Sequence, residues 1–119
     1  TYTSGMQIKI VTEPITRTEA REIASELYGD MVKGAADIER GIIALGGKWH
    51  MDANMKLIED GSKQNAVWGF NLYPDKEGEE RIEYVALINI RPALGNRDMY
   101  LEDAEIRERI RKTVDDLAP

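Results

Sequence analysis

Two segments in which apolar and polar side chains alternate constrain the fold most, because alternation is typical of strands with one buried face. They span residues 67–73 and 81–90, and the turn sequence Pro-Asp-Lys-Glu-Gly lies between them. We predict that they form two long antiparallel strands. The register that places the large apolar side chains on one face pairs Leu72 with Ile82, Phe70 with Tyr84 and Trp68 with Ala86.

The opposite face of this strand pair is more apolar than a solvent-exposed sheet face, because Val85 and Leu87 lie on it. Gly69 lies on the same face, and a glycine inside a strand often marks close approach by another backbone, a side chain or a ligand. Asn71 is expected beside Glu83 across the two strands. We therefore predict that the free face around Gly69 is the interface of a homodimer or of a protein-interaction module.

The sequence Thr16-Arg-Thr-Glu19 is a capping box, which predicts that a helix begins directly after the first threonine. Apolar side chains then recur every three or four residues from Ala20 to Ile42, so we predict one helix over 17–39. Gly29 lies within it and indicates a kink or a short break, with two shorter helices as the variant.

The remaining elements follow from local patterns. They are a strand over 7–11, a hairpin of 42–45 with 48–51 around Gly46-Gly47, a helix over 53–60 capped by Asp52 and ended by Gly61, and a last helix capped by Asp103. A single bulged strand is the alternative to the hairpin. Together they predict an α+β fold, a two-layer sandwich with an antiparallel or mixed sheet of about four to five strands and the helices mainly on one face.

Composition limits the class of protein and of partner. The 119 residues fit a single α+β domain over 6–119, and we interpret 1–5 as a disordered leader or an expression remnant. With 22 acidic and 16 basic side chains the net charge is −6, which argues against nucleic acid as a partner. No apolar run approaches the roughly 20 residues of a membrane span, and the lack of cysteine fits a reducing compartment. We expect a cytoplasmic protein without membrane contact.

The segment from Asn89 to Arg97 is the first candidate for a binding site. Arg91 lies at the end of a predicted strand, and Gly95 permits a tight loop that turns Arg97 back toward it. Two guanidinium groups in a short loop can bind a carboxylate or a phosphate bidentately; pairing with the abundant acidic side chains is the alternative. The predicted ligand-binding residues are Asn89, Arg91, Asn96, Arg97, Lys63 and Asn71.

His50 is the only histidine, and therefore the only side chain whose ordinary pKa lies near neutrality. On the predicted strand it shares a face with Lys48, and Asp52 and Glu39 are the nearest candidates in sequence for an orienting partner. As a general base it would serve a hydrolase or transferase; a half-exposed strand histidine is the alternative. One histidine without cysteines gives no metal-ligating pattern, so we expect neither a metal nor a cofactor.

Five motifs stand out in combination: Glu39-Arg40-Gly41, Gly46-Gly-Lys-Trp-His50, Asp60-Gly-Ser-Lys-Gln64, Trp68-Gly-Phe-Asn-Leu-Tyr-Pro74 and Asn89-Ile-Arg-Pro-Ala-Leu-Gly-Asn-Arg97. In combination they resemble those of a family of short prokaryotic proteins catalogued as a domain of unknown function. The resemblance implies a prokaryotic, cytoplasmic, stand-alone domain and adds weight to one site formed by His50 and the predicted ligand-binding residues. It implies no activity, so the leading interpretation is a homodimeric domain that binds a small anionic ligand, and enzymatic activity is left open.

Overall fold

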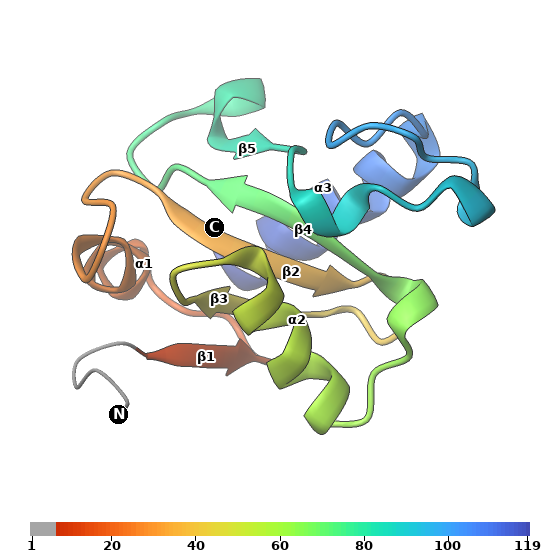
Figure 1. The fold of residues 1–119 in the computed structure, drawn as a ribbon. Helices are drawn as coiled ribbons and strands as arrows, with labels where there is room; N and C mark the ends of the chain where they lie inside the picture. The colour runs from red at the N-terminus through yellow and green to blue at the C-terminus, as the bar shows by residue number, and fades with distance from the viewer. Residues whose placement is uncertain (1–6) are drawn as a thin grey trace.

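The computed structural model describes residues 7–119, so the predicted leader over 1–5 lies outside the described residues. Within these residues the centre is a five-stranded antiparallel sheet with the strand order β1-β3-β2-β4-β5 (Figure 1). The strands are β1 (Ile8–Val11), β2 (Val32–Asp37), β3 (Ile42–Gly46), β4 (Val67–Leu72) and β5 (Ile82–Glu83). This sheet, together with the helices that pack on it, confirms the predicted α+β class.

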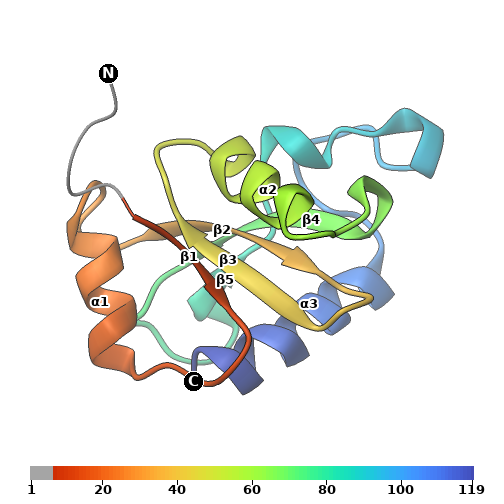
Figure 2. The ribbon, with the colours of Figure 1, turned by 90° about the horizontal axis from the view of Figure 1, so that it is seen from below.

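Helices cover both faces of the sheet (Figure 2). α1 (Arg17–Ser25) and α3 (Ala104–Leu117) pack on one face, and α2 (His50–Glu59) packs on the other. The larger apolar core lies under α1 and α3, and the smaller one lies under α2. Two helices therefore share one face as predicted, and α2 adds a partial third layer. None of the helices in residues 7–119 is long and apolar enough to cross a membrane.

Local capping signals are confirmed at two helices. The Thr16 hydroxyl accepts a hydrogen bond from the Glu19 amide at 3.1 Å, which starts α1. The Asp103 carboxylate accepts a hydrogen bond from the Glu105 amide at 2.9 Å, which starts α3. Each of these caps joins groups within one helical turn, so the sequence is enough to predict them.

The helix predicted over 17–39 is wrong beyond its first turns, and so is the variant with two helices. α1 ends at Ser25, Gly29 adopts a left-handed conformation with a φ of 83°, and the chain then enters β2. β2 is buried on both faces. A strand of this kind carries apolar side chains at consecutive positions, and these also fit a helical spacing. Periodicity therefore does not distinguish the two structures here.

Gly46-Gly47 forms neither the predicted hairpin nor a single bulged strand. β3 pairs with β1 on one side and with β2 on the other, so the tight connection lies at 38–41. The two glycines have positive φ angles of 117° and 95° and lead the chain away from the sheet into α2, which begins at His50. Asp52 caps this helix from inside its first turn, where its carboxylate accepts from the Trp49 amide at 2.9 Å. Gly61 follows the end of α2, as predicted.

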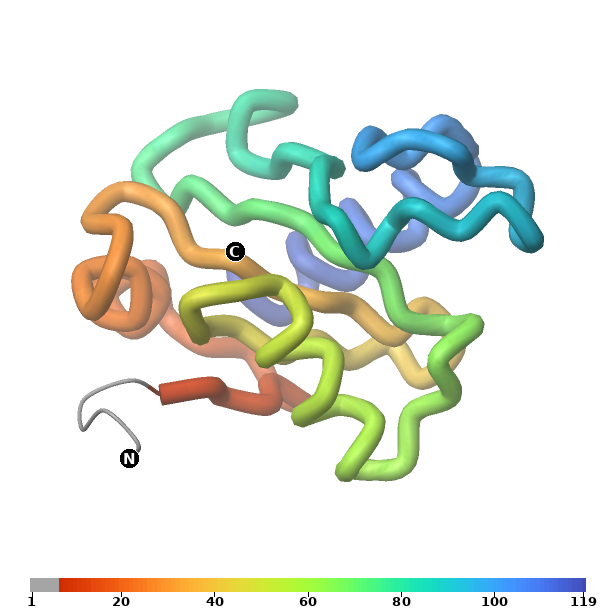
Figure 3. Tube along the Cα trace, viewed as in Figure 1, coloured from red at the N-terminus to blue at the C-terminus, as the bar shows by residue number. Residues whose placement is uncertain are grey.

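The strand predicted over 81–90 is much shorter in the structure. β4 and the pairing of Leu72 with Ile82 are confirmed. After Glu83 the main chain leaves the ladder, so the predicted main-chain pairs further along β4 are wrong: Phe70 with Tyr84, and Trp68 with Ala86. Residues 84–101 instead form a lobe beside the sheet (Figure 3), in which Val85 bridges Tyr100.

Replacing Trp68 with alanine tests the position of the larger core. Trp68 is 3% exposed, so Trp68→Ala removes a buried ring and leaves a cavity. We expect the free energy of unfolding to fall by about 3–5 kcal/mol in urea denaturation. The matched control is Trp49→Ala, which changes a ring that is 57% exposed and should cost less than about 1 kcal/mol. Equal losses in the two variants would refute this core assignment.

Candidate functional site

The outer edge of β4 continues beyond the end of β5 and needs hydrogen-bond partners there. Alternate residues of a strand direct their main-chain groups to the same neighbour, so Gly69 and Val67 face the side on which Asn71 pairs with Glu83. β5 ends at Glu83. A buried main-chain group without a partner costs about 1–3 kcal/mol, so other groups must supply these bonds.

The side chain of Asn89 takes the place of a strand at Gly69. Its Oδ1 accepts a hydrogen bond from the Gly69 amide at 2.8 Å, and its Nδ2 donates to the Gly69 carbonyl at 3.0 Å. The side-chain amide thus imitates a peptide group of a neighbouring strand. Glycine is needed for this approach, since a Cβ at position 69 would lie 2.6 Å from the Cβ of Ala86. The close approach predicted at Gly69 is confirmed, and the approaching group is the chain's own segment 86–91.

This segment corrects the prediction of a free sheet face around Gly69. Gly69, Ala86 and Asn89 are all buried, because residues 86–91 lie over the face that was expected to be open. Self-association stays a prediction, but this face cannot be its interface.

The side chain of Arg91 binds the next main-chain carbonyl group along this edge of β4. Its Nη2 donates to the Val67 carbonyl, its Nη1 donates to the Gln64 carbonyl at 3.0 Å, and its Nε donates to the Ile88 carbonyl at 2.9 Å. The guanidinium carbon lies 4.4 Å from the centre of the Trp68 ring. Burial lowers the pKa of Arg91 from its ordinary value. Each nitrogen of this guanidinium is therefore bound to main chain, and its role here is to close the β4 edge.

Of the other predicted ligand-binding residues of this region, one has a structural role and two are exposed. Asn96 is buried, donates to the Asn89 carbonyl at 2.8 Å and accepts from the Glu102 amide at 2.9 Å, so it holds the lobe together. Arg97 and Lys63 are exposed, and their side chains make no hydrogen bond within residues 7–119. Anion binding by this loop stays a prediction, and the structure leaves only the two exposed cations free for it.

A second polar cluster, which we call the His50 corner, lies where α2 begins above the sheet. It consists of Lys33, His50, Asn71, Tyr73 and Glu83. Lys33, Asn71 and Glu83 lie opposite one another on β2, β4 and β5. His50 is 9% exposed, and its Nε2 lies 2.7 Å from Asn71 Oδ1.

Glu83 completes the hydrogen bonds of the corner. Asn71 Nδ2 donates to Glu83 Oε1 at 2.8 Å, and the Tyr73 hydroxyl donates to the same oxygen at 3.1 Å. The cross-strand contact of Asn71 with Glu83 is confirmed. The expected partners of His50 are wrong: Asp52 binds the Trp49 amide, and Glu39 lies in the β2–β3 turn. The structure thus joins two predicted site residues, His50 and Asn71, at a place separate from the arginine loop.

The protonation of His50 follows from these contacts. Burial lowers the pKa of His50, and the positive charge of Lys33 lowers it further. The hydrogen bond to Asn71, the contact with the Phe70 main chain and the charge of Glu83 oppose this shift. Since the Asn71 amide nitrogen donates to Glu83, its oxygen faces the histidine, and a neutral ring carries its proton on Nε2. The Nδ1 atom is then the basic nitrogen.

Lys33 supplies the positive charge of the corner. Within residues 7–119 its ammonium group makes no ion pair, and it lies 5.2 Å from the centre of the Tyr28 ring and 5.5 Å from that of Trp49. These cation–π contacts orient the side chain without neutralising it. Sequence reasoning missed Lys33, because the helix predicted over 17–39 separates it from Asn71.

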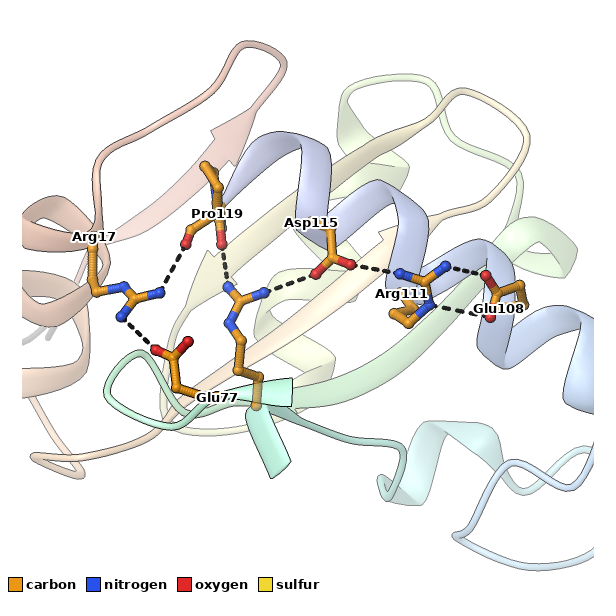
Figure 4. Close-up of polar contacts among 8 residues, drawn as sticks. Arg17, Glu77, Glu108, Arg111, Asp115 and Pro119 are labelled. Carbon is orange, nitrogen blue, oxygen red and sulfur yellow. Dashed lines mark hydrogen bonds and ion pairs between the residues drawn. The ribbon is translucent and has the colours of Figure 1, made fainter. Parts of the chain in front are cut away.

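A hollow of about 1010 Å³ lies between residues 73–85 and α3. Arg81, the buried cation of this hollow, pairs with Asp115 at 2.8 Å and also donates to the Ala118 carbonyl. Arg111 pairs with Asp115 at 2.6 Å and with Glu108 (Figure 4). These contacts fasten the end of α3 to the sheet and neutralise both arginines. Five acidic side chains line the hollow beside four basic ones, so it is a weaker candidate for binding an anion than the His50 corner.

The comparisons with known proteins identify a family and no activity. Residues 9–117 match a family model described as "Protein of unknown function (DUF5674)", which confirms the resemblance to a domain of unknown function. No curated protein and no solved structure matches the chain. Residues 7–119 hold no group of three or more His, Asp or Glu side chains that could hold a metal ion.

The role of Asn89 can be tested by its stability effect. Asn89→Ala leaves the Gly69 amide and carbonyl unpaired, so we expect the free energy of unfolding to fall by about 2–4 kcal/mol. Asn89→Asp keeps an acceptor for the Gly69 amide but buries a carboxylate oxygen against the Gly69 carbonyl, so at neutral pH its loss should be at least as large as that of Asn89→Ala. The control, Arg97→Ala in the same loop, should stay within about 0.5 kcal/mol of wild type. If Asn89→Ala is as mild as this control, Asn89 does not close the edge.

The lowered pKa of His50 makes stability depend on pH. As the pH falls through the ordinary histidine value of about 6.5, the unfolded chain binds a proton before the folded protein does, so acidification destabilises the fold. We expect the free energy of unfolding to decrease between about pH 7.5 and 5.5, and His50→Gln to show a flatter profile. Urea denaturation at several pH values measures this, and identical slopes in both proteins would contradict the assignment.

Proposed function

Because the chain belongs to DUF5674, a family of unknown function, we propose a function from its own geometry: the domain binds a small anionic ligand at the His50 corner. The observation that carries the proposal is Lys33, a cation without an ion pair among the described residues, which faces a buried histidine across the corner. Glu83 lies in the corner but does not pair with Lys33, so a carboxylate or a phosphate would supply the partner that this lysine lacks. This is the ligand class expected from the sequence, at a different place.

Four side chains of the corner have distinct parts in this proposal. Lys33 attracts the anion. An anion beside His50 favours the protonated ring and raises its pKa, so that binding takes up a proton. Asn71 fixes the orientation of the ring through its side-chain oxygen, and the negative charge of Glu83 also favours the imidazolium. Affinity for the anion should therefore rise as the pH falls.

General-base catalysis is the second candidate function, and the fixed orientation of His50 favours it. The ring presents Nδ1 as the base, while Nε2 is held by Asn71. An amide oxygen accepts a hydrogen bond but does not carry a proton onward at neutral pH, so Glu83 orients this system without serving as the final proton acceptor. A hydrolase or transferase of this kind would need His50 for turnover and Lys33 for the developing negative charge.

Titration with inorganic phosphate and with acetate tests the binding proposal. We expect each anion to shift the imidazole NMR signals of His50, with an affinity that increases from about pH 8 to pH 6. Lys33→Met should weaken phosphate binding about tenfold or more, because it removes the attracting charge.

The matched control is Lys63→Met, which removes an exposed lysine outside the corner and should leave binding unchanged. Loss of phosphate binding in Lys63→Met or Arg97→Ala, with Lys33→Met unaffected, would transfer the site to the arginine loop. If neither anion perturbs the His50 signals at any pH, the proposal is wrong.

A further inference from the structure

Two exposed aromatic rings lie beside Lys33, at the rim of the His50 corner. Trp49 is 57% exposed and Tyr28 is 39% exposed. The Tyr28 hydroxyl donates to the Lys48 carbonyl at 2.6 Å, which fixes this ring against the loop that leads into α2. The Lys48 ammonium lies 5.6 Å from the centre of the Trp49 ring. Two rings and two lysines therefore form one surface, which we call the aromatic platform: Tyr28, Lys33, Lys48 and Trp49.

The Trp49 side chain contributes little to the fold. The Trp49 side chain makes no hydrogen bond that caps α2, since Asp52 meets the Trp49 main chain instead. The Trp49 residue is more than half exposed, so little stabilisation comes from burying its side chain. Exposed rings flanked by cations are suited to a planar ligand, because a flat ring stacks on an aromatic face while the lysines attract its negative group.

The shape of this surface limits how a ligand can lie on it. The hollow beside Tyr28, Lys33 and Gly47 has a volume of about 10 Å³, which holds no more than a water molecule. A ligand therefore lies across the rings rather than inside a cavity. The net charge of −6 disfavours a long polyanion on this protein, so a ligand with one or two negative charges fits better than a nucleic acid.

We propose that the anionic ligand of the His50 corner carries a planar heteroaromatic ring that stacks on Trp49, as a nucleoside monophosphate does. This inference rests on the proposed function, because it assigns the anionic group to Lys33. In this arrangement Lys48 assists Lys33, and Tyr28 borders the ring. Stacking of a base on an aromatic side chain is worth about 1–3 kcal/mol, so the ring should add at least a factor of about five in affinity over phosphate alone.

Tryptophan fluorescence offers a direct test, because the chain has two tryptophans and Trp68 is buried at 3% exposure. A stacked ligand should quench Trp49 and leave Trp68 unaffected. Adenosine monophosphate, adenosine and inorganic phosphate are compared as probes. We expect quenching by adenosine monophosphate, weaker quenching by adenosine, and binding of phosphate without quenching, followed by the His50 NMR signals.

The variant Trp49→Leu tests the contribution of the aromatic ring to affinity separately from that of the lysine charges. In this variant adenosine monophosphate should bind only as tightly as inorganic phosphate, and Trp49→Phe should restore part of the difference. Equal affinity of wild type and Trp49→Leu for adenosine monophosphate would overturn the stacking inference and leave the anion site intact. Equal affinity of wild type for adenosine and adenosine monophosphate would overturn it too, since Lys33 would then contribute nothing. Absence of binding by phosphate and by adenosine monophosphate would refute the proposed function itself.

Discussion

The outer edge of β4 is the constraint on which much of this structure depends. β5 pairs with β4 only as far as Asn71, so the main-chain groups of Gly69 and Val67 need partners in the protein interior. The side chain of Asn89 binds both main-chain groups of Gly69, and the side chain of Arg91 donates to the Val67 carbonyl, while the Val67 amide donates to the Gln64 carbonyl. The two-residue spacing of Asn89 and Arg91 matches that of the β4 groups they bind, so a short irregular segment closes an edge that usually needs a strand.

This solution determines where a ligand can bind. The segment that carries Asn89 and Arg91 must lie over Gly69, so it covers the sheet face and uses the donors that a sequence reading assigns to an anion. Further along β4, beyond the reach of that segment, the opposed side chains of Lys33, Asn71 and Glu83 are polar and lie under the first residue of α2. The polar side chains along β4 thus form two groups: those at one end of the strand have a structural role, and those at the other end form the candidate site.

How much the sequence predicts depends on the range of the interactions. The starts of α1 and α3, β4, and the contact of Asn71 with Glu83 depend on near neighbours or on a simple alternation, and they were predictable. The alternation of apolar side chains places Asn89 in a long strand. It gives no sign that the Asn89 side chain, and not its main chain, binds Gly69. Lys33 was missed because β2 is buried on both faces and resembles a helix in its spacing. The sequence predicts both His50 and Asn71 as site residues, but their contact depends on the turn at Gly46-Gly47, which the sequence analysis interprets as a hairpin.

The side-chain amide of Asn89 takes the place of a strand at Gly69, and an NMR measurement of scalar coupling across hydrogen bonds tests this replacement. In protein labelled with ¹³C and ¹⁵N, we predict a coupling between the Gly69 amide nitrogen and the side-chain carbonyl carbon of Asn89, alongside the couplings of the β2–β4 ladder. If the ladder couplings are observed while the Gly69 nitrogen couples to no side-chain carbonyl, Asn89 does not close the edge, and the division of polar groups drawn from it is wrong.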